Sequence, residues 1–535
     1  MNQPAAADAS SPPSVARSAG RVGAATLLSR VLGLLREQIF AALVGATPFA
    51  DAFNVAFRIP NLLRDLFAEG ALSAAFVPTF TDYLVNRGIA DAWRLANRVL
   101  SAVMAVLAVL VLIAMLGAGP LVHAMAPGFD PEKAALTVTL TRIMMPFLIL
   151  ISMAAVSMGM LTSRHHFLET ALAPAAFNLV SILIGATLRL AGLSPRAAVI
   201  GWSVATLLGG FAQMIVHAPP LYRDGFRFVF LLREVRNDPG IRRILTLMAP
   251  ATIGLAGVQL NIFFNTIYAS AEPGAVSWLN YANRILQLPI GIFAVAIATV
   301  TTSSLAHRAA SKDAEGLRNT LSGSLRLVLF LTLPATAGLV TLHAPIIRLL
   351  YQHGRFNAGD TVHAAEALQL YALGLVAFAS VKVIAPAFYA LERPRVPLVA
   401  SLTAVVVNIA FCGWAYLTQA PDSLHRWLPL GTSLTAFVNV IVLLVGFRQV
   451  GGPLRWADLW SGLWRMGVAS ALCGWAAILT LHGAEQTLGS QTFLANGGAT
   501  LGAIAAGTVA YAAAAALLGI EELGVLVRFV RARRR

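Results

Sequence analysis

The sequence predicts an all-α integral membrane protein with about 14 transmembrane helices, arranged as two pseudo-symmetric six-helix lobes around a central cationic cavity and followed by two C-terminal helices. Three observations lead to this fold class. Hydrophobic residues make up 58% of the 535 positions and charged residues only 12%, against about 25% charged residues in soluble domains. Apolar runs of helix length recur along the chain, and a weak internal repeat divides it. This composition excludes a water-soluble enzyme.

The apolar runs define the predicted spans, since a helix needs about 20 mostly apolar residues to cross a hydrocarbon layer of about 30 Å. Two runs near the N-terminus, 22–46 and 49–83, contain charged residues and are still counted as spans. Twelve further runs meet the requirement or come close: 99–118, 143–160, 171–188, 197–218, 244–271, 278–304, 327–342, 368–391, 396–418, 428–447, 466–481 and 501–520. An even total of 14 places both termini on one side of the membrane.

The distribution of Lys and Arg tests this topology, because cytoplasmic connections collect basic residues. Connections on the side of the two termini carry 26 basic residues, and the opposite connections, which include 119–142 and 343–367, carry 7. Both termini are therefore expected in the cytoplasm. The net charge of +15 is interpreted as a topology signal facing anionic headgroups, and no nucleic-acid partner is expected.

An internal repeat predicts the domain organisation. Around the second and fifth spans of each half, two groups of four residues recur at offsets of 226 and 230: Ala56, Arg58, Ile59 and Leu62 match Ala282, Arg284, Ile285 and Leu288, while Leu161, Leu168, Leu172 and Asn178 match Leu391, Leu398, Leu402 and Asn408. Six helices per copy predict parallel repeats with a substrate path between them. The expected parts are a disordered cytoplasmic tail at 1–21, an N-lobe at 22–220, a C-lobe at 239–449, an extra helix pair at 459–520 and a basic cytoplasmic tail at 521–535.

Six cations remain inside the predicted spans: Arg30, Arg36, Arg58, Arg64, Arg284 and Lys382. Five arginines facing lipid would cost on the order of 12–17 kcal/mol, so they are expected to face a cavity, partners or the interface. Guanidinium groups bind phosphate oxygens through paired hydrogen bonds. Arg30, Arg36, Arg64 and Arg284 are therefore predicted to bind an anionic substrate with two phosphates, with structural ion pairing as the alternative. For Arg58 and Lys382, snorkelling to the interface is an equal alternative.

Asp51 and Glu69 flank the arginines of the second span and are assigned, with Arg58, a supporting or gating role. They are expected either to pair with Arg36, Arg58 or Arg64 or to lie near an aqueous mouth, and Asp65 and Glu69 also fit a solvated face. Asn261, Asn265, Asn408 and Asn439 fit helix-to-helix hydrogen bonds or a coupling cation. The ten histidines show no metal-ligand spacing and the sequence has no phosphate-binding loop, so neither catalytic residues nor a bound cofactor is expected.

Several motifs resemble the signature of the MurJ/MviN family of lipid II flippases. In the first half they are Ser29-Arg30-Val31-Leu32-Gly33 through Arg36, Asp51-Ala52-Phe53, Pro60-Asn61-Leu62-Leu63-Arg64, Phe67-Ala68-Glu69-Gly70-Ala71 and Phe76-Val77-Pro78. In the second half they are Val276-Ser277-Trp278, Tyr281-Ala282-Asn283-Arg284, Leu288-Pro289 and Tyr351-Gln352-His353-Gly354-Arg355-Phe356. The resemblance extends from about residue 22 to residue 520.

The resemblance implies the fold of the multidrug/oligosaccharidyl-lipid/polysaccharide exporter superfamily, with two lobes in a V and two extra helices that form a groove for a lipid tail. It implies translocation of lipid II, the undecaprenyl-diphosphate-linked peptidoglycan precursor, from the cytoplasmic to the periplasmic leaflet of the bacterial inner membrane. The charges required in that family match Arg30, Arg36, Asp51, Arg64 and Arg284. Asn283 departs from the family, which often has Asp at this position, and this puts a carboxylate role there in doubt.

The expected mechanism is alternating access, biased by the membrane potential or by a monovalent cation. The expected partners are lipid II, membrane lipids and proteins of cell-wall synthesis or division. Alternatives are a flippase for another polyprenyl-diphosphate-linked saccharide, a cation-coupled drug exporter, and a scaffold that recruits cell-wall enzymes. The drug exporter would favour buried carboxylates over arginines. An integral-membrane transferase or pyrophosphatase would need acidic or metal-binding loop motifs that the sequence lacks.

Overall fold

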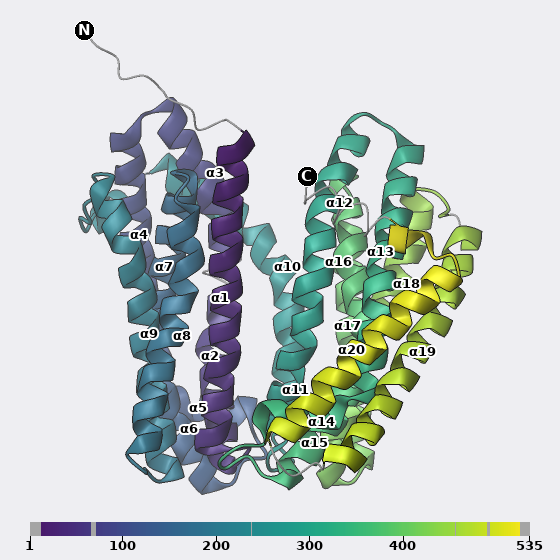
Figure 1. Cartoon of the computed structure of the whole chain (residues 1–535). Coiled ribbons are helices and arrows are strands. Elements are labelled where there is room, and N and C mark those ends of the chain that lie inside the picture. Colours follow the sequence, from purple (N-terminus) through teal and green to yellow (C-terminus); the bar gives the residue numbers. More distant parts are fainter. Residues whose placement is uncertain (1–11, 66–70, 237, 455, 489–492, 525–535) are drawn as a thin grey trace. The chain divides into compact units, whose positions relative to one another are not determined.

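All regular elements are helices in the part of the chain that the computed structural model describes, namely residues 12–65, 71–236, 238–454, 456–488 and 493–524 (Figure 1). The chain divides into two units, Met1–Gln259 and Leu260–Arg535. Both units are built from long apolar helices joined by short turns, as the predicted fold class requires.

The first unit packs its helices around a core of aromatic and aliphatic side chains that includes Phe76, Phe80 and Leu95. Its helices are α1 (Pro12–Val44), α2 (Pro48–Arg64), α3 (Ala71–Asn86), α4 (Ile89–Leu116), α5 (Ala118–Met125), α6 (Pro131–Met144), α7 (Phe147–Ser163), α8 (Phe167–Leu190), α9 (Pro195–Arg223), the 3-10 turn η2 (Leu232–Glu234) and α10 (Pro239–Ala269) as far as Gln259. Proline at the first helical positions of α2, α6 and α9 starts these helices, because its fixed φ suits that position and no hydrogen bond is lost there.

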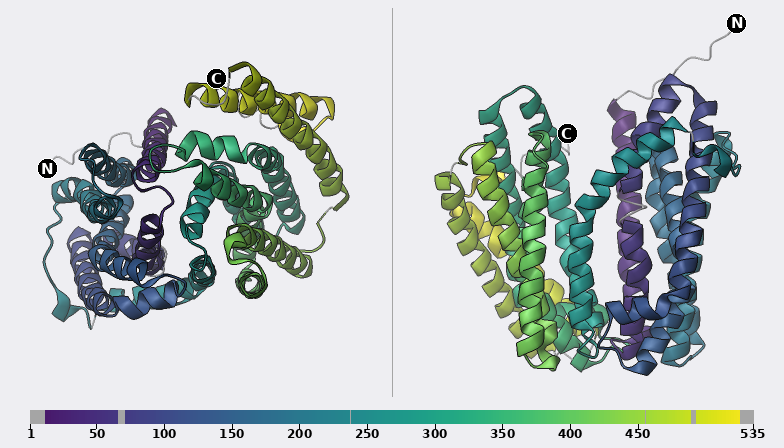
Figure 2. Two further views of the ribbon diagram at one scale, coloured as in Figure 1. Left: turned by 90° about the horizontal axis from the view of Figure 1, so that it is seen from below. Right: turned by 180° about the vertical axis from the view of Figure 1, so that it is seen from behind.

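The second unit begins with the end of α10 and closes with the extra helix pair (Figure 2). Its further helices are α11 (Ala275–Pro289), the π-helical turn η3 (Ile290–Ala294), α12 (Val295–Ala310), α13 (Ala314–Thr341), α14 (His343–Tyr351), α15 (Ala358–Leu373), α16 (Leu375–Ala390), α17 (Arg395–Thr418), the 3-10 turn η4 (Pro421–Ser423), α18 (Leu424–Val450), α19 (Trp456–Leu488) and α20 (Phe493–Leu517). Helices α19 and α20 pack on each other, and α19 packs on α13.

The order of helices α1–α9 recurs in α10–α18. Helices α4 and α13 both have 28 residues, and α8 and α17 both have 24. The first residues of α4, α6 and α8 precede those of α13, α15 and α17 by 225, 227 and 228 residues. These offsets agree with the 226 and 230 found in the sequence, so the duplication extends over the whole helical pattern.

Two connections that the sequence analysis treated as loops contain helices. Segment 119–142 holds most of α5 and α6, and segment 343–367 holds α14 and the first half of α15. These helices are short or partly polar, so they fail the 20-residue criterion for a span although they pack in the core. The N-termini of α6 and α15 are capped locally: Asp130 accepts from the backbone N–H of Lys133 at 2.9 Å, and Asn357 and Asp360 form a capping box.

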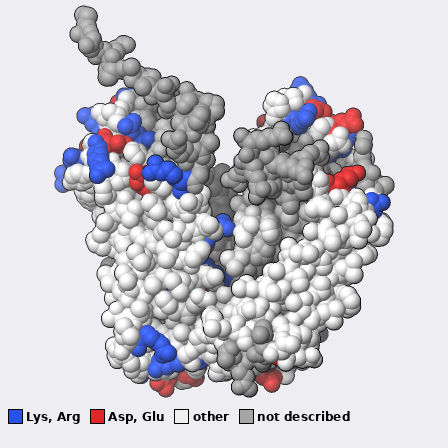
Figure 3. Space-filling model, viewed as in Figure 1, with Lys and Arg blue, Asp and Glu red and all other residues white. Residues whose placement is uncertain are grey.

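Ten helical segments among the described residues are long and apolar enough to cross a membrane, or eleven if the pair α15 and α16, bent by 42°, is one broken span. The chain is therefore a multi-pass membrane protein. The three other predicted spans correspond to α1, to α2 with α3, and to α10, and the exact count of 14 stays a prediction. On the face in Figure 3, most charged side chains gather near the ends of the helices and mainly uncharged side chains cover their sides, as lipid contact demands.

Helices α1, α8 and α9 approach closely at Gly185, on α8. A Cβ at this position would overlap the Trp202 ring on α9 and lie 2.9 Å from Ile39 Cγ2 on α1. Gly185→Ala is expected to lower the free energy of unfolding by about 1–3 kcal/mol through overpacking. Thermal unfolding in detergent measures this loss. Gly323→Ala is the matched control, because a Cβ there on α13 meets nothing within 4 Å; equal melting temperatures of the two variants would contradict the prediction.

Candidate functional site

The first pair of predicted substrate-binding residues lies on α1. Arg30 and Arg36 are six residues apart, which is about 9 Å along a helix. Arg30 is exposed, whereas only 15% of the Arg36 side chain is exposed. Arg36 Nη2 lies 2.5 Å from Glu37 Oε1, and its guanidinium carbon lies 5.1 Å from the centre of the Phe177 ring on α8. Arg36 is thus held by an anion and an aromatic face, while Arg30 is presented at the surface of the unit.

A hydrogen bond between side chain and backbone fixes α1 next to Arg30. Asn178 on α8 donates from Nδ2 to the carbonyl oxygen of Ser29 at 3.1 Å. Ser29 and Arg30 are neighbours, so this bond sets the position of α1 at the height of the arginine. Asn178 was noted in the sequence only as part of the repeat.

Asp51, in the first turn of α2, belongs to a buried ion pair. Lys133 Nζ on α6 lies 3.3 Å from Asp51 Oδ2, and the exposed fractions of the two side chains are 6% and 0%. The ammonium group also lies 4.1 Å from the centre of the Phe129 ring. A buried charge needs such a partner, because the cost of removing it from water is several kcal/mol. The expectation that Asp51 lies near an aqueous mouth is therefore wrong.

Arg58 and Arg64 lie further along α2 and are both half-buried. Arg64 donates from Nε and Nη2 to Asp65 Oδ1 at 3.0 and 2.8 Å, and Asp65 Oδ2 accepts from Gln259 Nε2 on α10 at 3.2 Å. Asp65 thus binds both Arg64 and Gln259 on α10. The sequence had also allowed Asp65 to belong to a solvated helix face. Glu69, the other predicted supporting carboxylate, lies outside the described residues.

Arg284 is the predicted binding residue of the second unit. It is exposed on α11 together with Asn283, while the opposite face of that helix is buried. On the buried face, Trp278 donates from Nε1 to Asp360 Oδ1 on α15 at 3.1 Å. Lys382, the remaining intramembrane cation, is exposed on α16.

The contacts of Asp51 and Trp278 occupy matching places in the duplicated pattern. Trp278 follows Asp51 by 227 residues, and Asp360 follows Lys133 by the same number. In each copy a buried polar contact therefore ties the start of the arginine-bearing helix, α2 or α11, to α6 or α15. Lys133 and Asp360 were not predicted as functional residues, because both lie in segments that were assigned to loops. The offset of 227 is the signal that could have found them.

The structure thus groups Arg30 with Arg36 on α1 and Arg58 with Arg64 on α2, and it places Arg284 in the other unit. The joint binding of one substrate by Arg30, Arg36, Arg64 and Arg284 stays a prediction. Within the second unit, Asn408 Nδ2 on α17 donates to Asn261 Oδ1 at 2.5 Å and to Asn265 Oδ1 at 2.8 Å on α10. These bonds join two helices, which is the first of the two uses expected for these residues.

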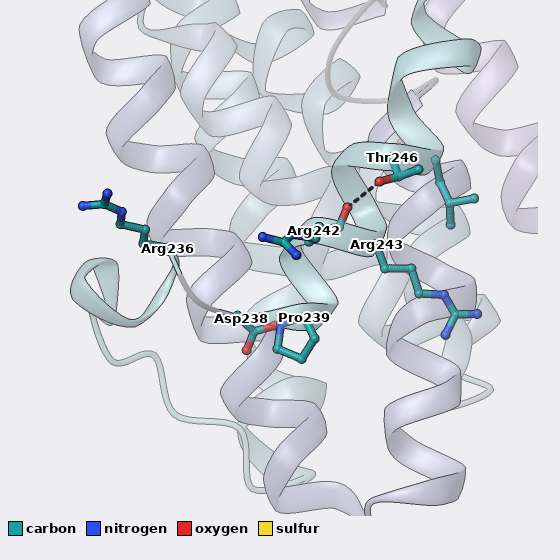
Figure 4. A pocket seen from close by; sticks show the side chains of 7 residues that line it. Arg236, Asp238, Pro239, Arg242, Arg243 and Thr246 are labelled. Atoms are coloured by element: carbon teal, nitrogen blue, oxygen red, sulfur yellow. Dashed lines mark hydrogen bonds between the residues drawn. The ribbon is translucent and has the colours of Figure 1, made fainter.

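A pocket of about 500 Å³ lies at the start of α10 (Figure 4). It is lined by Arg236, Asp238, Pro239, Arg242, Arg243, Thr246 and Leu247. Two of its charges have partners outside the pocket: Asp238 pairs with Arg98 on α4, and Arg243 Nη1 lies 2.9 Å from Asp82 Oδ2 on α3. These pairs fix the start of α10 against α3 and α4, in the basic segment that the sequence analysis interpreted as a topology signal.

Known proteins match nearly the whole length of this chain. The family model described as Lipid II flippase MurJ matches residues 40–504. A probable lipid II flippase MurJ of Rhizobium meliloti (strain 1021) is 36% identical over 523 residues, which are 97% of this chain and 96% of that protein. The lipid II flippase MurJ of Burkholderia cenocepacia is 35% identical over 433 residues, covering 80% of this chain and 82% of that protein.

Solved structures show the same fold. A structure titled "Lipid II flippase MurJ, inward closed conformation" has a TM-score of 0.77 at 24% identity and covers 93% of this chain and 98% of that chain. An inward-facing transporter of the MATE family of multidrug resistance proteins has a TM-score of 0.67 at 19% identity, covering 80% of this chain and 95% of that chain. The predicted all-α integral membrane fold is thereby confirmed.

The buried pair of Lys133 and Asp51 yields a stability prediction. Lys133→Met leaves the Asp51 carboxylate buried without its ammonium partner, and the free energy of unfolding is expected to fall by about 3–5 kcal/mol. Asp51→Asn combined with Lys133→Met removes both charges and is expected to cost clearly less than the sum of the single changes. Thermal unfolding of the four proteins measures this coupling. Strictly additive losses would show that the two side chains do not stabilise each other.

Proposed function

Because the chain belongs to the MurJ family of lipid II flippases, we propose that it carries lipid II from the cytoplasmic to the periplasmic leaflet of the bacterial inner membrane. The proposal rests on one observation: a probable lipid II flippase MurJ is 36% identical to this chain, and the alignment covers 97% of it. The family is one of transporters and not of enzymes, which agrees with the absence of catalytic residues expected from the sequence. The cytoplasmic position of both termini is part of the proposal and rests on the distribution of Lys and Arg.

The arginines supply the chemistry for the diphosphate of the headgroup. Arg30 and Arg284 are exposed on α1 and α11, and guanidinium groups form paired hydrogen bonds with phosphate oxygens. Arg36 and Arg64 already hold carboxylates, Glu37 and Asp65. We infer that the diphosphate replaces these carboxylates when it binds, so that the arginines exchange one anionic partner for another.

The undecaprenyl tail requires an apolar surface beside the headgroup site. Helices α19 and α20 pack on α13 through Phe330, Met466 and Tyr511, and the Tyr511 hydroxyl donates to the Phe330 carbonyl oxygen at 2.6 Å. On α19, three large side chains, Trp460, Trp464 and Trp475, stay exposed. We propose that the tail remains in lipid along this helix pair while the headgroup crosses.

Alternating access is the proposed transport cycle. A ligand shifts an equilibrium between inward- and outward-open states only if it binds the two states differently. We therefore propose that the arginines bind the diphosphate tightly in the inward-open state and separate in the outward-open state. The membrane potential, which is worth about 2.3 kcal/mol per charge per 100 mV, supplies one driving force. Binding of cell-wall synthesis or division proteins remains part of the proposal.

Depletion of the protein is the direct test of this function. Lipid II is expected to accumulate in the cytoplasmic leaflet of depleted cells and to return to the periplasmic leaflet after re-expression. A leaflet-resolved assay of the precursor measures this distribution. An unchanged distribution of lipid II, with accumulation of a different polyprenyl-diphosphate-linked saccharide, would assign the chain to that substrate instead.

Replacement of Arg284 tests the binding site. Arg284→Ala removes charge-assisted hydrogen bonds worth about 1.5–3 kcal/mol, so the apparent affinity for lipid II is expected to fall about 10- to 100-fold with little change in thermal stability, because the side chain is exposed. Binding of lipid II to the purified protein measures this. Arg94→Ala is the matched control, since Arg94 is exposed on α4. Unchanged binding by the folded Arg284→Ala variant would remove Arg284 from the site.

A further inference from the structure

A buried group of acid and base side chains lies in the second unit, apart from the arginines. Glu272, between α10 and α11, and His425, in the first turn of α18, are almost completely buried, and Glu366 on α15 is 29% exposed. We call these three residues the His425 triad. No sequence motif predicts this triad, because Glu272 and Glu366 lie 153 and 59 residues from His425.

The His425 ring bridges the two carboxylates. Its Nδ1 lies 2.6 Å from Glu272 Oε1 and its Nε2 lies 2.9 Å from Glu366 Oε2. A neutral imidazole carries one N–H and one lone pair, so it donates to only one carboxylate. Both contacts are hydrogen bonds only when a second proton lies on the ring or on a facing carboxylate. The geometry therefore describes a triad with room for one additional proton.

The two carboxylates have different surroundings. Glu272 is fixed by α18, because its Oε2 also accepts from the backbone N–H of His425 at 2.7 Å. Glu366 accepts from Arg426 Nε and Nη2, each at 2.8 Å, and Arg426 is 54% exposed. Glu366, whose side chain is 29% exposed, is therefore the member of the triad that water reaches.

The remaining neighbours connect the triad to α11. The rings of His363 on α15 and Trp278 on α11 lie 4.7 and 5.6 Å from the His425 ring, centre to centre, and they stack on each other at 4.1 Å. Trp278 also donates to Asp360, and Asp422 in η4 acts electrostatically on Arg426. These are the titratable and charged groups that α11, α15, η4 and α18 bring to the triad.

We propose that Glu272, Glu366 and His425 form a proton-binding site through which the pH of the water at Glu366 acts on transport. The proton enters from water at Glu366 and is shared with the His425 ring, and it leaves by the same route. Its loss leaves a lone pair facing a carboxylate and weakens the attachment of α18 to α15 and to the start of α11. Arg284 follows Trp278 by six residues on α11, so proton binding acts on the position of a substrate-binding arginine; this step rests on the proposed function.

The test uses the full chain in vesicles that contain fluorescent lipid II, with the membrane potential clamped to zero by potassium and valinomycin. For the wild type, the flipping rate is expected to change when a pH difference is imposed. His425→Gln and Glu366→Gln are expected to flip at a rate that no longer responds to the pH difference. His482→Gln is the matched control, because His482 is exposed on α19 and contacts only Ile478 of its own helix among the described hydrogen bonds; it is expected to respond like the wild type.

A full response in His425→Gln and Glu366→Gln, or no response in the wild type, overturns the role in transport. If the wild type flips no lipid II under any condition, the proposed function fails, and thermal unfolding between pH 5 and pH 9, a range of about two units on either side of neutrality, then decides on proton binding alone. The difference in melting temperature between wild type and His425→Gln is expected to shrink as the pH rises, since deprotonation removes a contact that the variant lacks. A difference that is constant with pH overturns the site itself.

Discussion

The buried contact between Asp51 and Lys133 represents the constraint on which the rest of the structure depends: a charge within an apolar helical bundle persists only where a partner is within reach. The same constraint explains the pairs of Arg36 with Glu37 and of Arg64 with Asp65. It also explains why the charged helices α1 and α2 are members of the bundle although arginines interrupt their apolar surfaces. The pairing residues Glu37 and Asp65 therefore fix the positions of the Arg36 and Arg64 side chains.

Because the helical pattern is duplicated, the need for a buried polar partner arises twice, and the two copies meet it with different residues. At the start of α2 the contact is an ion pair between a carboxylate and an ammonium group, and at the equivalent place in α11 it is a hydrogen bond from an indole to a carboxylate. The acidic residue has moved to the opposite helix, from α2 to α15. What the two copies share is a buried polar contact that fixes the first turn of a helix whose later turns carry an arginine. This geometry tolerates the exchange of residues because only the pairing is needed.

Long-range pairing is also what the sequence could not reveal. The long apolar helices, the duplication and the isolated arginines follow from local composition and periodicity, and the structure contains the helices. The sequence did not predict helices α5, α6, α14 and α15 as separate elements, because each is too short or too polar to meet the criterion for a span. Lys133 lies 82 residues from Asp51, and Glu272 lies 153 residues from His425. Nothing in the local pattern distinguishes such residues from ordinary loop charges or from a scattered histidine.

The carboxylate partners of the arginines bear on how a flippase can both bind and release a diphosphate. A carrier must hold its substrate strongly enough to admit it and weakly enough to let it leave. If Arg36 and Arg64 stood without anions, they would pay a large desolvation cost when empty and bind phosphate with correspondingly high affinity. Glu37 and Asp65 already pair with them, so on the proposed mechanism binding replaces one ion pair by another, and the net gain is small compared with the gross attraction. Arg30 and Arg284 are both exposed, so on the proposed mechanism the diphosphate reaches them from water, and a change in their separation supplies the difference in affinity between the two states that drives the cycle.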